Sequence, residues 1–592
     1  MLKNITLKTG LCVIGGGMSG LCAAIAAARH GTKVVLIHER PVLGGNASSE
    51  IRMWICGAQG RDNRETGIIE EIMLENLYRN PTKNFFIWDS ILLDFVRREQ
   101  NITLLLNTAC IDAGIEQGRF AHGRDTKILS VKAYQLTTQR FYTVFADSFA
   151  DCSGDSILAP LTGAKFMYGR ESAQEFGEQT HLCEHDRNVM GTSCLIQGRE
   201  TASPVPFTPS EQTPPLSDED VRRRPMDLYR SSENFWYLEL GGNENTVDHA
   251  EATRDELVPL ALGAWQYLKE HPAYRAENWE LDFLGFLPAK RESRRMTGEY
   301  IVTQRDISSD TVFDDTVAFG GWPLDDHDPG GYRFKGRPNT SIPTPAPYCL
   351  PYRALYSANV VNLFFAGRNI SATHLALSST RVMATCALLG QAVGTAASIA
   401  CAEGLTPHEV YLDRLTGLQR LLMDDDCFLP HFRRSIAPEC VPEPELAALC
   451  DGKDRPNRIY GEGPCGIDAV NGTELAYSLP RPVENISVHI VFDSDLNRDT
   501  LPGDACERTH ATRANTRLDS PVMHMPTTLC KEFRLLAQTG GSTREILHVD
   551  NNRRRSFHIR VDGTVERLAL IPLSNWGGSG STRVFSFDFD RA

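Results

Sequence analysis

The sequence lacks several features that would place it in other classes of protein. Its 16 cysteines include no C-x-x-C pair, so neither an iron–sulfur site nor a disulfide framework is indicated. No apolar run approaches the length of a membrane span, and the N-terminus has no signal-peptide core. Positive charge is scarce: a net charge of −14 at pH 7 argues against binding to nucleic acid or to an anionic membrane. We therefore expect a reduced, cytoplasmic, multidomain globular protein without a metal ion.

A glycine-rich stretch near the N-terminus organises the chain. Residues 11–14 form a short apolar run typical of a buried strand, and the pattern G-x-G-x-x-G follows at 15–20, directly before a small-residue helix at 21–30. Glycines allow a tight turn and let a pyrophosphate approach the backbone, while N–H groups at the start of the helix hold the phosphates. The predicted contacts here are Gly15, Gly17, Met18, Ser19 and Gly20.

An acidic residue ends the second predicted strand, at 33–39. Glu39 follows Gly20 by 19 residues. A carboxylate there can accept both hydroxyls of an adenosine ribose and would repel a 2′-phosphate, which favours a non-phosphorylated dinucleotide. The alternative is a glycine-rich turn in an ordinary α/β protein.

The residues after Glu39 indicate which dinucleotide is bound. Arg40 is followed by Gly44-Gly45, and with this stretch the sequence resembles the FAD-dependent oxidoreductases of the glutathione-reductase-like superfamily. The closest group is the bacterial succinate dehydrogenase/fumarate reductase-like type, and the resemblance covers residues 11–402. It implies FAD as the cofactor. The contacts it implies in this stretch come from Arg40, Gly45, Asn46, Ser48, Ser49 and Arg52.

Two later segments resemble the other FAD-contact strands of this superfamily. The first ends in Ser153 and Gly154, where A-T-G is usual, and Asp155 then either caps a helix or has a functional role. The second ends in Ala-Gly and implies contacts from Gly367, Arg368 and Asn369. Arg368 stands where the family usually has an acid that binds the ribityl chain, so this contact would pass to Asn369 and the backbone.

Four residues are predicted to act on the substrate. The resemblance places His374 and Arg381 beside the flavin ring, where His374 would take up a hydroxyl proton and Arg381 would hold an anionic or hydroxylated substrate, or the flavin carbonyl. Arg291 and Arg295 belong to an Arg-Glu-Ser-Arg-Arg run that can clamp a carboxylate or a polyol. The alternatives are a structural histidine and a solvated basic turn.

Other reactive side chains have simpler interpretations. Cys56 is either a flavin or substrate contact or a packed thiol. His181 and His185 flank Cys183, but this group is an incomplete ligand set, so the prediction remains that no metal is bound.

The predicted fold is α/β with an accessory all-β module. It consists of a Rossmann-like FAD-binding domain with a parallel sheet and a β-meander, an inserted α+β substrate domain and a C-terminal β-sandwich. The predicted segments are 1–165 and 351–405 for FAD binding, 166–350 for the substrate domain, 406–450 for a helical connector and 451–592 for the β-sandwich.

These expectations combine into one predicted function, with alternatives. The enzyme would move hydride from a hydroxylated small molecule to flavin N5, and the β-sandwich alone favours a sugar or glycoside, within carbohydrate metabolism. One alternative is a reductase or desaturase of a small unsaturated carboxylic acid. A second alternative is a glycan-binding protein with a vestigial flavin domain, for which Trp576 and the arginines at 553–555 are the candidate glycan contacts. The electron acceptor and any homo-oligomer stay open.

Overall fold

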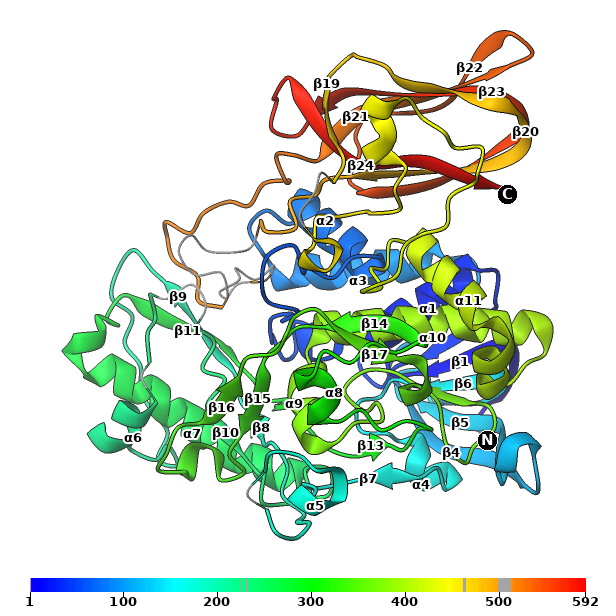
Figure 1. Cartoon of the computed structure of the whole chain (residues 1–592). Coiled ribbons are helices and arrows are strands. Elements are labelled where there is room, and N and C mark those ends of the chain that lie inside the picture. Colours follow the sequence, from blue (N-terminus) through cyan, green and yellow to red (C-terminus); the bar gives the residue numbers. More distant parts are fainter. Residues whose placement is uncertain are drawn as a thin grey trace. The chain divides into compact units, whose positions relative to one another are not determined.

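The computed structural model describes residues 2–180, 182–224, 226–229, 233–461, 465–498, 512 and 514–591 (Figure 1). His181 lies outside the described residues. The chain divides into two compact units. The first comprises 1–58, 82–415 and 509–522, and the second comprises 59–81, 416–508 and 523–592.

A seven-stranded sheet forms the base of the first unit, in the order β3-β2-β1-β6-β5-β4 with β18 also on β6. Parallel pairs join β1 to β2 and β6, β2 to β3, and β18 to β6, while β4, β5 and β6 pair antiparallel as a meander. This arrangement confirms the predicted Rossmann-like sheet with a β-meander. The strands are β1 (Asn4–Ile14), β2 (Val34–Ile37), β3 (Ile102–Leu105), β4 (Thr108–Gln117), β5 (Thr126–Gln135), β6 (Arg140–Asp151) and β18 (Leu363–Phe365).

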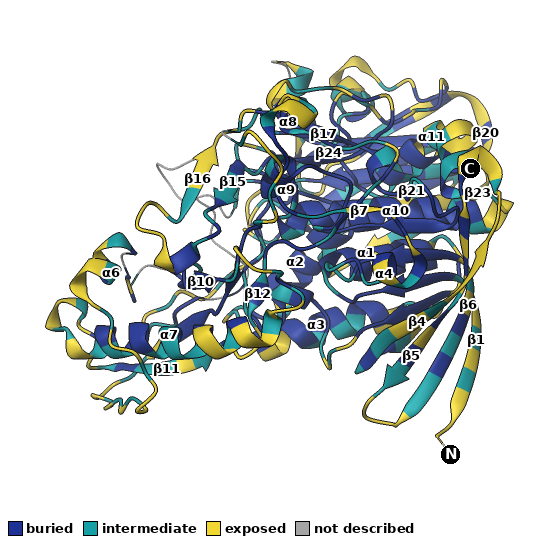
Figure 2. Ribbon diagram, turned by 90° about the horizontal axis from the view of Figure 1, so that it is seen from below, coloured by how far each residue is buried: buried dark blue, intermediate teal, exposed yellow. Residues whose placement is uncertain are grey.

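Two buried helices, α1 (Met18–Arg29) and α10 (Met383–Glu403), cross at very short range (Figure 2). A Cβ on Gly390 would lie 2.0 Å from the Ser19 carbonyl oxygen, and one on Gly394 would lie 2.1 Å from the Ala23 oxygen. Helix α10 is long and apolar enough to cross a membrane, but 89% of its apolar window is buried inside the protein. Its apolar composition is therefore accounted for by packing.

The remaining elements of the first unit are short, apart from the helices α7 (Ala250–Glu270) and α3 (Phe85–Arg98). The sequence pattern predicts a helix at 250–270, and α7 has these bounds; it anchors a separate core that includes Trp265 and Trp279. The other helices are α3 (Phe85–Arg98), α4 (Leu158–Thr162), α5 (Ala173–Phe176), α6 (Asp218–Arg223), α8 (Gln304–Ser308) and α9 (His374–Thr380). The paired strands are β7 (Phe166–Met167), β8 (Thr192–Ser193), β9 (Ile196–Glu200), β10 (Glu239–Leu240), β11 (Trp279–Leu284), β12 (Ala289–Lys290), β13 (Arg295–Met296), β14 (Thr316–Gly320), β15 (Leu324–His327), β16 (Asn339–Ile342) and β17 (Tyr348–Pro351).

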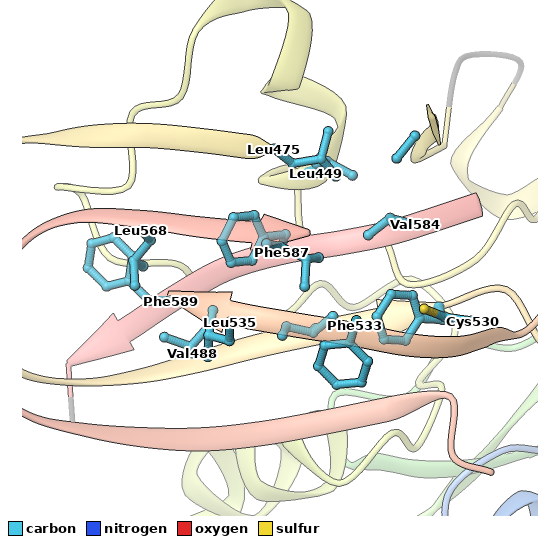
Figure 3. Close-up of a cluster of buried hydrophobic side chains, with 14 of the residues drawn as sticks. Leu449, Leu475, Val488, Cys530, Phe533, Leu535, Leu568, Val584, Phe587 and Phe589 are labelled. Atoms are coloured by element: carbon cyan, nitrogen blue, oxygen red, sulfur yellow. The ribbon is translucent and has the colours of Figure 1, made fainter. Parts of the chain in front are cut away.

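The second unit contains an antiparallel, sandwich-like sheet in the order β19-β24-β20-β23-β21-β22. Bulges interrupt the pairing of the two longest strands, β20 and β23, and so let them bend. Their apolar side chains fill one core with those of β21 and β24 (Figure 3). The elements are α2 (Ile68–Arg79), β19 (Ile467–Val470), β20 (Leu475–Phe492), β21 (Cys530–Thr539), β22 (Ser542–Val549), β23 (Ser556–Asn575) and β24 (Ser581–Arg591).

Several predicted helices have different limits in the structure. The sequence pattern predicts an amphipathic helix at 63–79. In the structure this helix begins at Ile68, because Gly67 has a φ of 80° that a right-handed helix does not contain. The helix predicted to end at residue 402 is α10, which begins at Met383 after the extended Val382 and ends at Glu403. The predicted helical connector is helical in α11 (Pro407–Asp424) and then irregular, with one 3-10 turn at Pro444–Leu449.

The two compact units do not coincide with the five segments predicted from the sequence. Residues 166–350 lie in the same unit as the parallel sheet, and residues 59–81 lie in the unit of the C-terminal sheet. Thr516 also joins the first unit, where its N–H donates to the Gly198 carbonyl over 2.9 Å. The five predicted segment boundaries themselves stay a prediction.

Candidate functional site

The glycine motif forms a narrow cradle between β1 and α1. Gly15 has a φ of 104°, and a Cβ there would lie 2.3 Å from the Cys152 carbonyl oxygen. A Cβ on Gly20 would lie 1.9 Å from the Gly15 oxygen, so Gly20 keeps the helix against the turn. No side chain caps the start of α1. The cradle therefore presents backbone, which suits an anionic group.

A second loop packs directly on this cradle. The Gly44 N–H donates to the Gly16 carbonyl over 2.8 Å, and a Cβ on Gly45 would lie 3.1 Å from the Gly17 Cα. His38 holds both loops: its Nδ1 accepts from the Gly16 N–H over 3.0 Å, and its Nε2 donates to the Val42 carbonyl over 2.9 Å. The sequence analysis missed His38, although it directly precedes the acid at the end of β2.

A cavity of about 340 Å³ opens at the carboxyl ends of these strands. This is the edge at which open α/β sheets bind their ligands. Most of the predicted cofactor residues line it: Gly15, Gly17, Met18, Ser19, Glu39, Arg40, Gly45, Asn46, Ser153, Gly154, Gly367 and Arg368. Its wall also includes residues that were not predicted as cofactor contacts: His38, Gly44, Ile51, Cys152, Asp155, Leu287, Pro288, Lys290, Arg381, Met383 and Cys386.

Glu39 remains ionised at the rim of the cavity. Burial alone would raise the pKa of its carboxyl group, but the contact with the His38 side chain and the charge of Arg40 outweigh this and lower the pKa to about 2. An ionised carboxylate that is about half exposed can accept both hydroxyls of a ribose.

Asp155 binds two cations in the cavity wall. Its Oδ1 accepts from Nη2 of Arg368 over 2.5 Å, and its Oδ2 accepts from Nζ of Lys290 over 2.7 Å. Burial would raise the pKa of Asp155, but these two cations outweigh it and hold the pKa well below its usual range. Of the two predictions for Asp155, the structure does not support the helix cap, because Asp151 accepts from the Leu158 N–H at the start of α4.

Arg368 keeps one donor without a partner. Its Nη1 is buried and makes no hydrogen bond, and Gly154 leaves room for the side chain, since a Cβ there would lie 2.9 Å from Nε of Arg368. Four cationic side chains line the cavity against two acidic ones. This excess of positive charge suits the pyrophosphate of a dinucleotide.

The other predicted cofactor residues lie outside the cavity wall. Ser48 is buried and the Ser49 N–H donates to Asp89 over 3.1 Å. Arg52 stacks 4.3 Å from the ring centre of Phe283. Gly20 acts through packing, and Asn369 is buried with its Nδ2 donating to Oγ of Ser156 over 3.2 Å. Roles for these five in cofactor contact stay predictions. In the structure each of them is buried or contacts another part of the protein, as described above.

Arg381 is the predicted substrate residue that lines the cavity. Its Nη2 donates to the carbonyl oxygen of Asp325 over 3.1 Å and to its Oδ2 over 3.0 Å. Its Nε is buried and has no hydrogen-bond partner. One part of the guanidinium group is therefore fixed by β15, and another donor remains available.

His374 is placed differently from its predicted role as a proton acceptor. Its Nδ1 lies 2.8 Å from Oε2 of Glu292, and its Nε2 lies 2.9 Å from Oδ1 of Asp326. Burial would lower the pKa of His374, but the two carboxylates outweigh it and raise the pKa to about 10. The ring is a buried imidazolium at neutral pH, without a lone pair to accept a proton, and it is not part of the cavity wall.

The two predicted arginines of the insertion are also occupied internally. Arg291 is buried and donates from Nη1 to Ser193 over 2.7 Å and from Nη2 to the Trp236 carbonyl over 2.9 Å. Arg295 is fully buried and donates to Oε1 of Glu171 over 2.8 Å. They are neither a solvated basic turn nor open to a substrate.

Acidic residues that the sequence analysis missed organise these cations. Asp325 joins Arg381 to His327, and His327 in turn lies 2.7 Å from Oε2 of Glu239, which pairs with Arg291. Asp325 and His327 lie in one strand, but Glu239, Arg291 and Arg381 are far from them in the sequence, and the group matches no motif. The Asp-Asp-His run at 325–327 is the one signal that could have drawn attention to them.

The remaining candidates have structural surroundings. Cys56 packs in a hydrophobic cluster with Trp54 and Val382. Within the ranges that the structure describes, no group of three or more histidine, cysteine, aspartate or glutamate side chains could hold a metal ion.

The candidate glycan contacts of the second unit are engaged within it. Nε1 of Trp576 donates to the Asn552 carbonyl over 2.8 Å. Arg553 pairs with Glu75 and Arg555 with Asp426. These contacts account for Trp576, Arg553 and Arg555, while the side chain of Arg554 is 55% exposed and its Nε lies 3.9 Å from Oε2 of Glu71.

The cavity fits FAD on the evidence of its own residues. The cradle excludes side chains where a pyrophosphate must approach, Glu39 suits the ribose, and Arg40 and Arg368 each have a buried Nη1 that makes no hydrogen bond. Gly15, Gly17, Glu39, Arg40 and Arg368 are the residues that would hold it.

Comparisons with solved structures include flavoproteins and a carbohydrate-binding module, all of low similarity. The quinol fumarate reductase subunit FrdA of E. coli is 11% identical, over 75% of this chain and 77% of that one, with a TM-score of 0.28. The myxobacterial chondrochloren halogenase CndH is 14% identical, over 71% and 80%, with a TM-score of 0.31. The family 32 carbohydrate-binding module of Streptococcus pneumoniae EndoD is 11% identical, over 27% and 92%, with a TM-score of 0.18. These scores carry no argument about the reaction.

A comparison with curated proteins gives no match. The family described as FAD dependent oxidoreductase matches residues 10–422, which include the cradle, the cavity wall and all of the parallel sheet except the first residues of β1. Family and cavity agree on the cofactor, so this chain belongs to the FAD-dependent oxidoreductase family and its cofactor is FAD.

Proposed function

We propose that this oxidoreductase removes hydride from a hydroxylated small molecule, of the class of a sugar or glycoside. Bound FAD supplies the hydride acceptor. The observation that carries the proposal is Arg381, which lines the same cavity as the glycine cradle and keeps a buried Nε–H without a partner. The sandwich-like C-terminal sheet favours a sugar, because such modules are often joined to carbohydrate enzymes.

In this proposal Arg381 anchors an oxygen of the substrate. Asp325 fixes its Nη2, so the guanidinium group loses little freedom when it binds. Asp325 is itself held by Nδ2 of Asn339 over 2.5 Å and by His327 over 3.3 Å. Asp325 and His327 are therefore positioning residues.

His374 takes a positioning role in place of the predicted base. As a cation between Glu292 and Asp326, it neutralises one buried and one half-buried carboxylate and ties β15 to α9. Arg295 adds a second cation 3.5 Å from Glu292. This network supports the strand that carries Asp325.

A second candidate is the reduction or desaturation of a small unsaturated carboxylic acid. The excess of cationic side chains in the cavity favours it, since Arg381 can bind a carboxylate as well as a hydroxyl. The two candidates differ in the direction of electron flow, which an experiment can separate.

The test is anaerobic mixing of the yellow protein with a panel of sugars, glycosides and hydroxy acids, followed by flavin bleaching. We expect bleaching by a sugar, and a loss of about 100-fold or more in its rate in Arg381→Met. Arg381→Lys keeps the charge and should recover part of the rate, while Asp325→Asn should raise KM more than it lowers kcat. An equal rate in Arg381→Met would remove this residue from the site.

The reverse experiment addresses the alternatives. Protein reduced with dithionite is mixed with unsaturated carboxylic acids, and return of the yellow colour with no bleaching by any alcohol would favour the reductase. A protein that binds no flavin but is retained on a glycan column would favour the glycan-binding alternative. The cytoplasmic setting and a homo-oligomer stay predictions.

A further inference from the structure

Two cysteines of the second unit face each other at short range. Sγ of Cys440 lies 3.5 Å from Sγ of Cys450. Cys440 is buried, and Cys450 is half-buried at the end of the 3-10 turn Pro444–Leu449. Both sulfurs lie on the core of the sandwich-like sheet: Cys440 is 3.5 Å from the Tyr477 hydroxyl of β20, and Cys450 is 3.2 Å from the Phe587 carbonyl of β24.

This pair differs in its chemistry from most of the buried thiols. Burial raises the pKa of thiols such as Cys194 and Cys530 to about 12. For Cys440, the hydrogen bond with Cys450 is the largest effect and lowers the pKa below its ordinary value. The thiolate is the reactive form of cysteine, so Cys440 is the more nucleophilic sulfur.

We propose that Cys440 and Cys450 are a reversible dithiol–disulfide pair, oxidised by a small hydroperoxide such as hydrogen peroxide. One thiolate attacks a peroxide oxygen and becomes a sulfenic acid, with release of water. The second sulfur then displaces water from the sulfenic sulfur and forms the S–S bond. In sum, two thiols and one H₂O₂ give one disulfide and two H₂O.

The geometry requires a small movement. A disulfide bond is about 2.05 Å long, so the sulfurs must approach by about 1.5 Å. The segment between them is irregular or 3-10, and Val441 at its start is 58% exposed, so it can adjust without breaking a strand. The bond would close a short loop and fix Leu449, a member of the core, against the sheet.

The sequence provides a direct assay in the full chain. Trypsin cuts after Arg434 and Lys453, and no lysine or arginine lies between them, so both cysteines fall in the single peptide 435–453. Reduced protein is treated with a small excess of hydrogen peroxide, blocked with N-ethylmaleimide under denaturing conditions and digested. We expect this peptide to become about 2 Da lighter and resistant to the label, and dithiothreitol to restore both thiols.

Variants and an internal standard keep the test decisive. Cys440→Ser and Cys450→Ser should each abolish the 2 Da loss, and Cys465→Ser, a change at a buried cysteine of the same unit, should not. Oxidation should raise the Tm of the wild type by about 5 °C and leave that of Cys450→Ser unchanged. If peptide 435–453 keeps both labels at peroxide levels that oxidise the exposed Cys183, the proposal is wrong. The thiol count needs no flavin reduction, so it is independent of the proposed reaction.

Discussion

At the scale of single residues, the resemblance implies a departure of this chain from its family, an exchange of charge in the cofactor cavity. Arg368 stands in place of the acid usual after the third contact strand, and it pairs with Asp155, which follows β6. Lys290 also binds Asp155, so the local sum remains positive. Such a cluster suits a phosphate better than a ribityl hydroxyl.

Arg368→Met should therefore weaken FAD binding. A charge-assisted hydrogen bond contributes about 1.5–3 kcal/mol, so we expect the Kd of FAD to rise by about 10- to 100-fold in a flavin fluorescence titration. Riboflavin, which has no phosphate, should bind the variant and the wild type alike, and Arg368→Lys should lose less than Arg368→Met. An equal loss for riboflavin and FAD would assign Arg368 to the ribityl chain instead.

The pKa of His374 predicts a loss of stability at alkaline pH. Its folded pKa of about 10 lies above the unfolded value of 6.5, so its contribution is complete below pH 6.5 and disappears as the pH rises through 10. A shift of this size corresponds to roughly 3–5 kcal/mol for a fully buried group. Urea unfolding at pH 6.5 and pH 10 should show this extra loss in the wild type.

His374→Gln provides the control for that measurement, because glutamine does not titrate. The variant should be less stable than the wild type at pH 6.5, where Glu292 and Asp326 lose their cation. The difference between the two proteins should shrink towards pH 10. A constant difference across this range would show that His374 is neutral in the folded protein.

At the scale of elements, the crossing of α1 and α10 positions the cofactor cradle. Gly390 and Gly394 face the backbone of Ser19 and Ala23, so the two helices meet without side chains between them. Since α1 begins at the cradle and Met383 and Cys386 of α10 line the cavity, this distance also sets the width of the site.

Gly394→Ala should separate these helices. Alanine normally favours a helix over glycine by about 1 kcal/mol, but here its Cβ would lie 2.1 Å from the Ala23 oxygen. We expect a net destabilisation of about 3 kcal/mol by chemical unfolding, together with weaker FAD binding.

The matched change is Gly417→Ala in α11, where a Cβ meets nothing within 4 Å. That variant should be more stable by about 0.5–1 kcal/mol. The two substitutions have the same chemistry and opposite expected signs, so a stabilising effect of Gly394→Ala would contradict the helix crossing described above.

At the scale of the whole molecule, the N-terminal segment 59–81 belongs to the same compact unit as the C-terminal sheet. Leu74 and Leu77 of α2 are buried in the core of the C-terminal sheet. Glu70 of the same helix binds both Arg64 and Arg498, and all three are buried. Folding of the second unit therefore needs residues 59–81 as well as the C-terminal third of the chain.

A chain truncated after residue 415 should accordingly be poorly soluble, because Leu74 and Leu77 would lose their core. Replacing both with serine should improve the solubility of the truncated chain. In the full chain the same pair of substitutions should destabilise by about 4 kcal/mol or more, since each removes a buried leucine. The two substitutions should thus help the truncated chain and harm the full chain. Soluble expression and thermal unfolding of both chains, with and without the substitutions, test this, and equal solubility of the two truncated chains would contradict it.

The local pattern of the sequence determined the parallel sheet, the glycine cradle and Glu39, because these depend on short segments with fixed backbone requirements. The choice of FAD came from the resemblance of the stretch after Glu39 to a known family. A segment of about twenty residues is enough to predict a strand, a turn that only glycine permits and the helix that follows. For the same reason the ends of α7 were predicted correctly. The all-β texture of the C-terminal region follows from alternation along each strand.

Only the tertiary structure decided the partners of the charged residues. Nothing near His374 in the sequence reveals Glu292 and Asp326, which arrive from other elements and turn the expected base into a cation. The same holds for Asp155 with Arg368, for the buried Arg295, and for α2 in the C-terminal core. The protonation and role of a side chain depend on the groups that folding brings next to it. The conformation that the backbone requires is set by the residues of the same short segment.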